Sequence, residues 1–288
     1  MESMLPPSSP SPIQNLLQLA ADLRSENGCP WDKEQNHSSV IPCLLEESYE
    51  VVDTIERKDD VHLREELGDL LFQVVFHCQL ASERGAFNWD EVVSEIVEKL
   101  VRRHPHVYES VGNIKDSEGV LGQWDEIKKK EKADKAKRTG AEAEVSVLDG
   151  IPLSLPSIQR SEKIQSKVAK QGFDWENVSG VFEKFKEEIG ELQEAIGQNA
   201  DSGLKKIPYS ENIEEEVGDL FFLLVNLSRK LSLDPETTLR KANEKFEKRF
   251  RLMEDLLSQK KEMMKGKSLE ELDLLWNRSK EILKQKIV

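Results

Sequence analysis

Cysteine is scarce in this chain, and its placement excludes two kinds of structural site. The 288 residues contain three cysteines, Cys29, Cys43 and Cys78, with no C-x-x-C spacing. Disulfide frameworks and zinc sites normally use cysteines in even numbers or at short paired spacings. We therefore expect neither, and we expect a protein of the reducing cytoplasm.

Long apolar runs are missing as well. The longest largely apolar stretches cover residues 70–76 and 220–225, whereas a membrane-spanning helix needs about 20 apolar residues. Residues 1–12 are rich in Ser and Pro and lack the basic-then-apolar pattern of a secretion signal. The sequence therefore predicts no membrane partner and an unstructured lead-in over residues 1–12.

Positive charge is in deficit. Lys and Arg number 41 against 55 Asp and Glu, which gives a net charge of -14. Proteins that bind nucleic acid in general carry a basic stripe that neutralises phosphates. The balance argues against a nucleic-acid partner and against binding to an anionic membrane surface.

The dominant pattern is helical periodicity, and no run of alternating β-branched residues predicts a strand. Asn88 and Asp234 are predicted N-caps, and Pro235 suits a first helical position. The expected helices cover residues 12–26, 42–57, 61–84, 89–104, 119–132, 156–170, 178–197, 210–230, 235–260 and 269–284. The fold class predicted is all-α.

A charged, low-complexity stretch begins at Lys128 and is typical of a solvated helix end that runs into a linker. We place the domain boundary there. The predicted organisation is a lead-in over residues 1–12, a first domain over 13–127, a linker over 128–147 and a second domain over 148–288.

The most informative motif is an acidic pattern that occurs twice. Each copy has an E-x-x-E pair followed by an E-x-x-D pair, and residues three apart on a helix share a face. The first copy has Glu47, Glu50, Glu66 and Asp69, and the second has Glu188, Glu191, Glu216 and Asp219. Two such helices side by side would direct four carboxylates at one point, where their mutual repulsion requires a divalent cation.

The similarity between the two halves extends beyond these acids. A tryptophan precedes each acidic pair (Trp31 and Trp175), and another follows each copy (Trp124 and Trp276). Each predicted N-cap, Asn88 or Asp234, stands 11 residues before a lysine of a basic segment. The matching order of these landmarks indicates a duplicated helical domain.

These residue types suit phosphoanhydride hydrolysis. Carboxylates without histidine favour Mg²⁺, with Mn²⁺ as an alternative. Each copy also has a Lys and an Arg four residues apart, Lys99 with Arg103 and Lys245 with Arg249. Such a cationic pair beside a metal could hold a polyphosphate, and a tryptophan could stack on a nucleobase.

Other interpretations stay open from the residues alone. The basic pairs could form a solvated helix face, and each tryptophan could pack in a core. The whole chain could be a non-catalytic acidic helical partner or a metal-binding protein. A di-iron bundle is a further alternative, but it would use E-x-x-H pairs, and Asp69 and Asp219 occupy the position of the histidine.

The acidic pattern and its surroundings resemble the MazG family of nucleoside triphosphate pyrophosphohydrolases in its two-domain bacterial form. The resembling segments are Gly28-Cys-Pro-Trp-Asp32, Leu44-Leu-Glu-Glu-Ser-Tyr-Glu50, Glu65-Glu-Leu-Gly-Asp-Leu-Leu-Phe72, Arg102-Arg-His-Pro-His-Val107, Leu148-Asp-Gly-Ile-Pro152, Gly172-Phe-Asp-Trp175 and Lys241-Ala-Asn-Glu-Lys-Phe246. The resemblance covers all but the lead-in and the linker. It implies two tandem MazG-like helical bundles that form a homodimer.

The resemblance also implies an activity and assigns residues. Family members use magnesium to cleave nucleoside triphosphates between the α and β phosphates, releasing a nucleoside monophosphate and pyrophosphate. The family's metal ligands correspond to the eight acidic residues of the two copies. Lys245, Arg249, Lys99 and Arg103 would contact phosphates, Trp276 would contact the nucleotide, and Lys163 and Lys167 would lie near the phosphates.

The two copies differ in one spacing. Glu66 follows Glu50 by 16 residues, whereas Glu216 follows Glu191 by 25. The additional residues, around 199–210, are expected to form a longer surface loop, or alternatively a lid or partner contact. We expect the second copy to be the catalytic one, with Glu188, Glu191, Glu216, Asp219, Lys245 and Arg249 as its catalytic residues.

Overall fold

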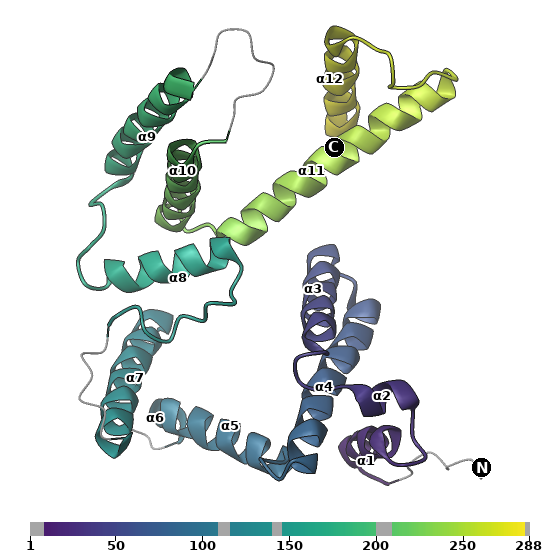
Figure 1. Cartoon of the computed structure of the whole chain (residues 1–288), viewed down its shortest axis with the longest axis vertical. Coiled ribbons are helices and arrows are strands. Elements are labelled where there is room, and N and C mark those ends of the chain that lie inside the picture. The colour runs from purple at the N-terminus through teal and green to yellow at the C-terminus, as the bar shows by residue number, and fades with distance from the viewer. Residues whose placement is uncertain (1–8, 109–115, 140–145, 200–208, 286–288) are drawn as a thin grey trace. The chain divides into compact units, whose positions relative to one another are not determined.

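The computed structural model describes residues 9–108, 116–139, 146–199 and 209–285, and every element of regular structure in them is a helix (Figure 1). This confirms the all-α fold class. The chain divides into two compact units, Met1–Glu142 and Ala143–Val288. The division falls inside the predicted linker over residues 128–147.

In the first unit, the helices that pack most extensively against each other are α3 and α4, and α1 also packs against α4. Val40, Phe76 and Leu80 form a buried cluster there, with Phe72 packed against it. The elements of this unit are α1 (Pro12–Arg24), α2 (Pro30–Glu34), α3 (Ile41–Arg57), α4 (Asp60–Glu83), α5 (Trp89–Arg103), α6 (Pro105–Tyr108) and α7 (Ser117–Thr139).

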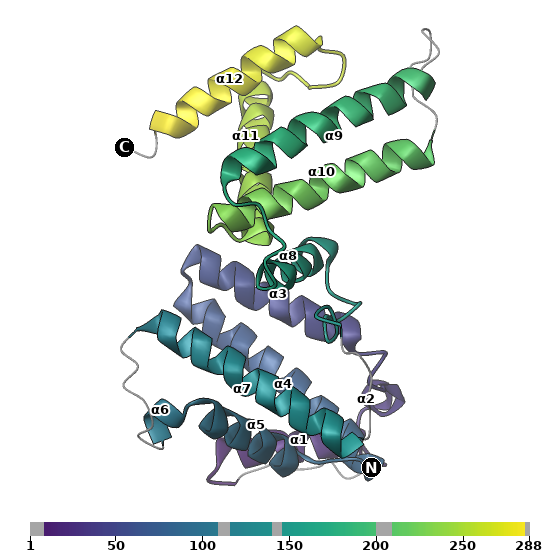
Figure 2. The ribbon, with the colours of Figure 1, turned by 90° about the vertical axis from the view of Figure 1, so that its left-hand side faces the viewer.

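The second unit repeats this plan. Its elements are α8 (Ser157–Ala169), α9 (Val178–Asn199), α10 (Glu211–Lys230), α11 (Pro235–Gln259) and α12 (Leu269–Gln285). Here α9 and α10 form the main pair, α8 packs on α10, and α12 packs on α11 (Figure 2). The order α8, α9, α10, α11 therefore matches α1, α3, α4, α5, so the pair that carries the acidic residues has the same place in both units.

Both predicted N-caps are confirmed. The Asn88 side chain accepts a hydrogen bond from the Glu91 backbone N–H, and the Glu91 carboxylate accepts one from the Asn88 backbone N–H, which completes a capping box. The Asp234 side chain accepts a hydrogen bond from the Thr237 N–H, with Pro235 in the first turn. These caps fix where α5 and α11 begin, and with them the positions of the basic pairs.

Some boundaries differ from the sequence prediction. Helix α7 continues to Thr139, so residues 128–139, the first part of the predicted linker, are helical. The short helices α2 and α6 were not expected, because five and four residues are too few to show a helical period. Most of the lead-in (residues 1–8) and most of the loop around 199–210 lie outside the described residues. Within the described residues, no helix has the length and apolarity that crossing a membrane requires.

Candidate metal centres and their surroundings

Helices α9 and α10 bring three carboxylates of the second unit to one point. One oxygen from each of Glu188, Glu216 and Asp219 lies within 4.8 Å of the other two. The three-residue spacing keeps Glu216 and Asp219 on one face of α10, and the packing of α9 against α10 places Glu188 opposite them. Glu191 is exposed, but it lies close enough for its charge to act on Glu216.

Helices α3 and α4 form the same arrangement in the first unit. Oxygens of Glu47, Glu66 and Asp69 lie within 4.8 Å of one another. Glu50, the fourth predicted ligand, interacts with Glu47 through a hydrogen bond and through its charge. The structure thus groups three of the four residues of each predicted acidic set, and each group comes from two helices that are consecutive in the chain.

The electrostatics of the two clusters show that their carboxylates repel. Burial, the charge of Asp69 and the charge of Glu50 raise the pKa of Glu47. Burial, a hydrogen bond with Glu188 and the charge of Glu191 raise the pKa of Glu216. A cation among these oxygens would reverse both charge effects, because an opposite charge favours the ionised carboxylate.

Exposed acidic groups often occur without a metal, so burial decides whether these residues fit one. Glu188 is 4% exposed. The Oε2 atom of Glu216 is buried and has no hydrogen-bond partner. A buried carboxylate oxygen without a partner is costly, and a divalent cation with oxygen ligands would satisfy it. The second unit's residues therefore fit Mg²⁺ or Mn²⁺.

Lys184 also belongs to this cluster, although it was not among the residues predicted from the sequence. Its ammonium lies 2.7 Å from a Glu188 oxygen and 2.6 Å from a Glu187 oxygen, and the hydrogen bonds to Glu187 and Glu188 raise the pKa of Lys184. The available signal was its position one helical turn before Glu188. The matching position in the first unit, one turn before Glu47, is Cys43.

The predicted basic residues of the second unit lie on α11, and one of them meets the predicted tryptophan. The Arg249 guanidinium lies 5.5 Å from the centre of the Trp276 ring, and Phe246 packs on the same ring with centroids 5.0 Å apart. Lys245 is exposed. Among the described residues of this unit, neither Lys245 nor Arg249 makes an ion pair with the acidic cluster, so α11 and α12 present a separate basic and aromatic surface.

The corresponding residues of the first unit are arranged differently. The Arg103 guanidinium lies 2.7 Å from one oxygen of Glu131 on α7, and Arg102 lies 2.8 Å from the other. Trp124 packs edge-on against His104, with ring centroids 5.1 Å apart. Lys99 is partly exposed. Arg103 is therefore engaged in an ion pair within its own unit, unlike Arg249.

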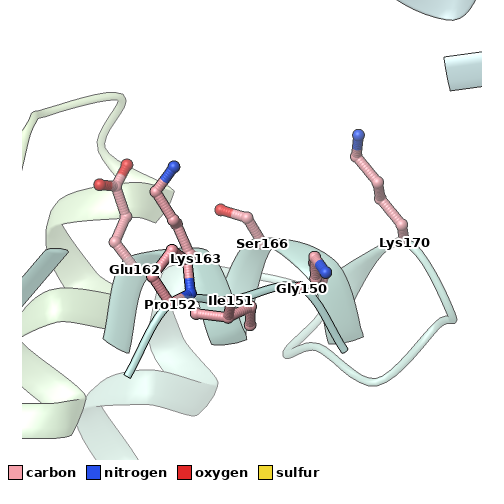
Figure 3. Close-up of a pocket in the computed structure, with 8 residues that line it drawn as sticks. Gly150, Ile151, Pro152, Glu162, Lys163, Ser166 and Lys170 are labelled. Atoms are coloured by element: carbon pink, nitrogen blue, oxygen red, sulfur yellow. The ribbon is translucent and has the colours of Figure 1, made fainter. Parts of the chain in front are cut away.

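Lys163 and Lys167 lie on the far side of α8 from the acidic cluster. Gln165, between them, is 2% exposed, and its amide donates a 2.8 Å hydrogen bond to the Phe222 carbonyl on α10. Residues two apart are about 200° apart around a helix, so both lysines point away from α10. They line a pocket against Gly150, Ile151 and Pro152, whose lining includes none of the predicted metal ligands (Figure 3).

The tryptophans before the acidic pairs have different surroundings. Trp175 lies over Gly180 at the start of α9, so closely that a methyl group on Gly180 would be 2.6 Å from the ring. Trp31 is 57% exposed. Trp175 has the packing role that was left open for it, and the ring of Trp31 is accessible.

Comparisons with known proteins agree with the repeated geometry. The model of the MazG nucleotide pyrophosphohydrolase domain matches residues 35–108 and again residues 176–251. Each match contains one complete acidic set and one basic pair. Trp276, Lys163 and Lys167 lie outside both matches.

Several relatives match over most of the chain. The chain is 44% identical over 269 residues to a nucleoside triphosphate pyrophosphohydrolase of Escherichia coli (strain K12), covering 93% of this chain and 97% of that protein. It is 41% identical over 269 residues to the nucleoside triphosphate pyrophosphohydrolase/pyrophosphatase MazG of Thermotoga maritima, covering 93% and 95%. It is also 40% identical over 260 residues to the uncharacterized protein YabN of Bacillus subtilis, covering half of that protein. The chain belongs to the MazG nucleotide pyrophosphohydrolase family, and it carries the family's domain twice.

Proposed function

We propose that this chain hydrolyses nucleoside triphosphates at the α–β phosphoanhydride, releasing a nucleoside monophosphate and pyrophosphate. Two relatives that match nearly the whole chain are named nucleoside triphosphate pyrophosphohydrolases, which supports a hydrolase of acid anhydrides. The observation that carries the proposal is the buried Glu188 carboxylate facing Glu216 and Asp219, with a Glu216 oxygen that has no other partner.

Glu188, Glu191, Glu216 and Asp219 would hold Mg²⁺, or Mn²⁺, in the second unit. When bound, the ion supplies positive charge that offsets the substrate's phosphates and makes a nearby water more acidic. The protein's own contribution is to hold these carboxylates at fixed positions on two packed helices. One of them, kept ionised, would orient the attacking water or take its proton.

The cationic residues would bind the polyphosphate. Lys184 already lies beside Glu188, so its ammonium is in position to contact a phosphate once a cation neutralises that carboxylate. Lys245 and Arg249 would contact phosphates from α11, and Trp276, which packs against Arg249, would contact the nucleotide. The idea that Lys163 and Lys167 contact the same phosphates stays a prediction, and their position on the far side of α8 favours a separate role.

Two differences between the units favour the second copy as the catalytic one. Lys184 has no cationic counterpart in the first unit, where Cys43 takes its place. Arg249 lies on Trp276, whereas Arg103 is held by Glu131. Glu47, Glu50, Glu66 and Asp69 would still bind a cation, with Lys99 and Arg103 less able to receive a phosphate.

The decisive experiment is a product analysis with Mg²⁺ over a panel of nucleoside triphosphates. We expect a nucleoside monophosphate and pyrophosphate, and no turnover after chelation with EDTA. Glu188→Gln or Glu216→Gln should lower kcat by about a hundredfold or more, since each removes a ligand charge from the centre. Lys184→Met should lower kcat/KM by about tenfold or more, because it removes a charge-assisted contact.

Control variants separate the predicted loss of activity from a general effect of changed charge. Glu183→Gln changes an exposed carboxylate of the same helix whose ion pair, within the described part of the chain, is with Lys186 at 3.0 Å, so it should leave turnover unchanged. Release of a nucleoside diphosphate and orthophosphate would show that the wrong bond was assigned. An absence of turnover with every nucleotide would favour the alternative, a non-catalytic acidic helical partner or metal-binding protein.

A further inference from the structure

The segment between α8 and α9 is tied to the C-terminal end of α10 by charged side chains. The Asp174 carboxylate forms ion pairs with Arg229 at 2.6 Å and with Lys230 at 2.8 Å, and both cations belong to the last turn of α10. Lys230 also donates a hydrogen bond to the Trp175 carbonyl. The segment, residues 172–177, is therefore attached to α10 through a side chain and through its backbone.

These ion pairs are more shielded from water than those of an exposed helix face. The exposed fractions of the three charged side chains lie between 16% and 18%. Burial raises the pKa of Asp174, but hydrogen bonds from Arg229 and Lys230 outweigh that effect and lower the pKa to about 2. The carboxylate is therefore ionised at neutral pH, and removing it would cost more than breaking a fully solvated pair.

The same segment fixes the start of α9. The Asn177 side chain accepts hydrogen bonds from the backbone N–H groups of Ser179 at 2.9 Å and Gly180 at 3.3 Å, which is the pattern of a helix N-cap. The Trp175 ring lies over Gly180. Because this segment is attached to α10, it holds the first turn of α9 at a set rotation.

The rotation of α9 decides where Glu188 points. Val181, Glu188 and Ala195 are 0%, 4% and 7% exposed, and residues seven apart lie on nearly the same side of a helix. A rotation that exposes Val181 would therefore also turn Glu188 away from the acidic residues of α10. Since Mg²⁺ requires near-ideal octahedral geometry, its affinity for the cluster depends on this rotation.

The first unit makes the same connection with residues from other positions. The Arg24 guanidinium of α1 pairs with Glu83, the last residue of α4, at 2.7 Å. It also donates to the carbonyls of Asp32 and Gln35, the latter at 3.2 Å, in the segment that precedes α3. In both units, an ion pair joins the end of the second acidic helix to the segment before the first. Its recurrence with different residues favours a positional role over an incidental surface contact.

We propose that Asp174 is a positioning residue for the metal centre of the second unit. By holding residues 172–177 on the end of α10, it keeps α9 at the rotation in which Glu188 faces the carboxylates of α10. Glu216 precedes Arg229 by 13 residues, about 20 Å along the helix, so a direct effect of the Asp174 charge on the cation is screened. This role rests on the proposed function, since it takes the acidic cluster as a metal site.

Titration of the full chain with Mn²⁺, followed by the EPR signal of free Mn²⁺, tests this role. The background carries Glu47→Gln and Glu66→Gln, which leaves the acidic cluster of the second unit as the intact one. In this background we expect Asp174→Asn to weaken Mn²⁺ binding by about tenfold, the size of effect that outer partners of metal ligands have. Lys230→Met, which keeps the pair of Asp174 with Arg229, should weaken it by a smaller factor.

A matched variant controls for the lost charge. Glu247→Gln removes an exposed carboxylate of the same unit that pairs with Arg251 at 3.4 Å, so it should leave the Mn²⁺ affinity unchanged. Thermal unfolding in EDTA reports the stability of each variant separately from metal binding.

The outcomes distinguish this role from the proposed function. Equal Mn²⁺ affinities of Asp174→Asn and Glu247→Gln would overturn the role of Asp174 alone, even if Asp174→Asn unfolds at a lower temperature. If Asp174→Asn does not fold, Lys230→Met carries the test, and an unchanged affinity for that variant overturns the role. An absence of Mn²⁺ binding in the background chain would overturn the metal centre, and with it both this role and the proposed function.

Discussion

At the residue scale, the grouping of the acidic residues was predictable from the sequence, and the contacts of the basic residues were only partly so. The E-x-x-E and E-x-x-D spacings place two carboxylates on one helix face by geometry alone. The sequence did not single out Lys184, because a lysine one turn before a glutamate is common on any exposed helix. Its importance comes from Glu188, which is buried on a helix that packs against α10.

A histidine pair in the first unit provides a second feature of this scale. The Arg84 guanidinium donates to His37 Nε2 at 2.9 Å, and His37 Nδ1 lies 2.8 Å from His77 Nδ1. Because Arg84 occupies Nε2 of His37 as a donor, the His37 proton must be on Nδ1 and point at the unprotonated Nδ1 of His77. In this arrangement Nδ1 of His77 is an acceptor, and the Nε2 atom of His77 is buried without a hydrogen-bond partner.

This pair predicts a loss of stability in mild acid. Burial and the nearby His37 lower the pKa of His77 below its ordinary value of 6.5. The unfolded chain then binds a proton more readily than the folded chain, so the stabilisation is complete above pH 6.5 and is lost as pH falls through the lower folded-state value. The loss should be at most about 1 kcal/mol, because water screens this partly exposed pair.

Thermal unfolding of the full chain at several pH values measures this loss of stability. His77→Leu should weaken the dependence on pH in that window, while His62→Gln, which changes an exposed histidine paired with Asp59 at 2.7 Å, should leave it in place. Among the described residues, Arg84 is the charged group with a hydrogen bond to this pair, through His37. An unchanged pH profile for His77→Leu would rule out this assignment.

At the element scale, the periodicity of apolar residues in the sequence predicted which segments are helices, and capping residues predicted where two of them begin. The long helices from α3 to α5 and from α8 to α12 lie close to their predicted ranges. Asn88 and Asp234 show why, since each supplies an acceptor to an otherwise unpaired backbone N–H. A helix as short as α2 is too short to show a helical period in the sequence. The loop before α2 depends on a tertiary contact, the close approach of the Gly28 backbone to the Leu23 carbonyl.

The start of α9 gives a prediction at this scale. A methyl group at Gly180 would lie 2.6 Å from the Trp175 ring, so Gly180→Ala forces that ring to move. We expect a destabilisation of about 1–3 kcal/mol from overpacking, offset in part by the better helix propensity of alanine.

Chemical denaturation of the full chain provides the measurement. Gly190→Ala is the matched control, because Gly190 is also inside α9 and a methyl group there would meet nothing within 4 Å. That control should stabilise the chain by up to about 1 kcal/mol from helix propensity alone. If the two variants unfold at the same denaturant concentration, the contact of Trp175 with Gly180 has no energetic importance.

At the scale of the whole molecule, each unit exposes apolar helix faces that its own described residues do not cover. Helix α5 has no buried residue. Its exposed apolar side chains are Val93, Ile96, Val97, Leu100 and Val101. On α10, Phe221 is 61% exposed and Leu224 is 51% exposed. Apolar stripes of this kind usually pack against another helix.

We predict that a second copy of the chain covers these faces, which makes the molecule a homodimer. Sedimentation equilibrium should give twice the chain mass of 32.9 kDa. Phe221→Glu should shift the mass towards a single chain, since a charge in an apolar interface is strongly unfavourable. Glu211→Lys, an exposed change on the same helix, should leave the mass unaltered, and a monomeric mass for the unaltered chain would contradict the prediction.

The sequence by itself determined the helical class, the duplication and the two acidic sets, because periodicity, caps and three-residue spacings act within a single helix. Only the tertiary structure decided which side chains meet across helices. It buried Glu188 opposite Glu216 and Asp219, bound Arg103 to Glu131 and turned Lys163 and Lys167 away from α10. Those outcomes depend on how one helix is rotated against the next, and that rotation is set by packing of the whole core rather than by any local pattern.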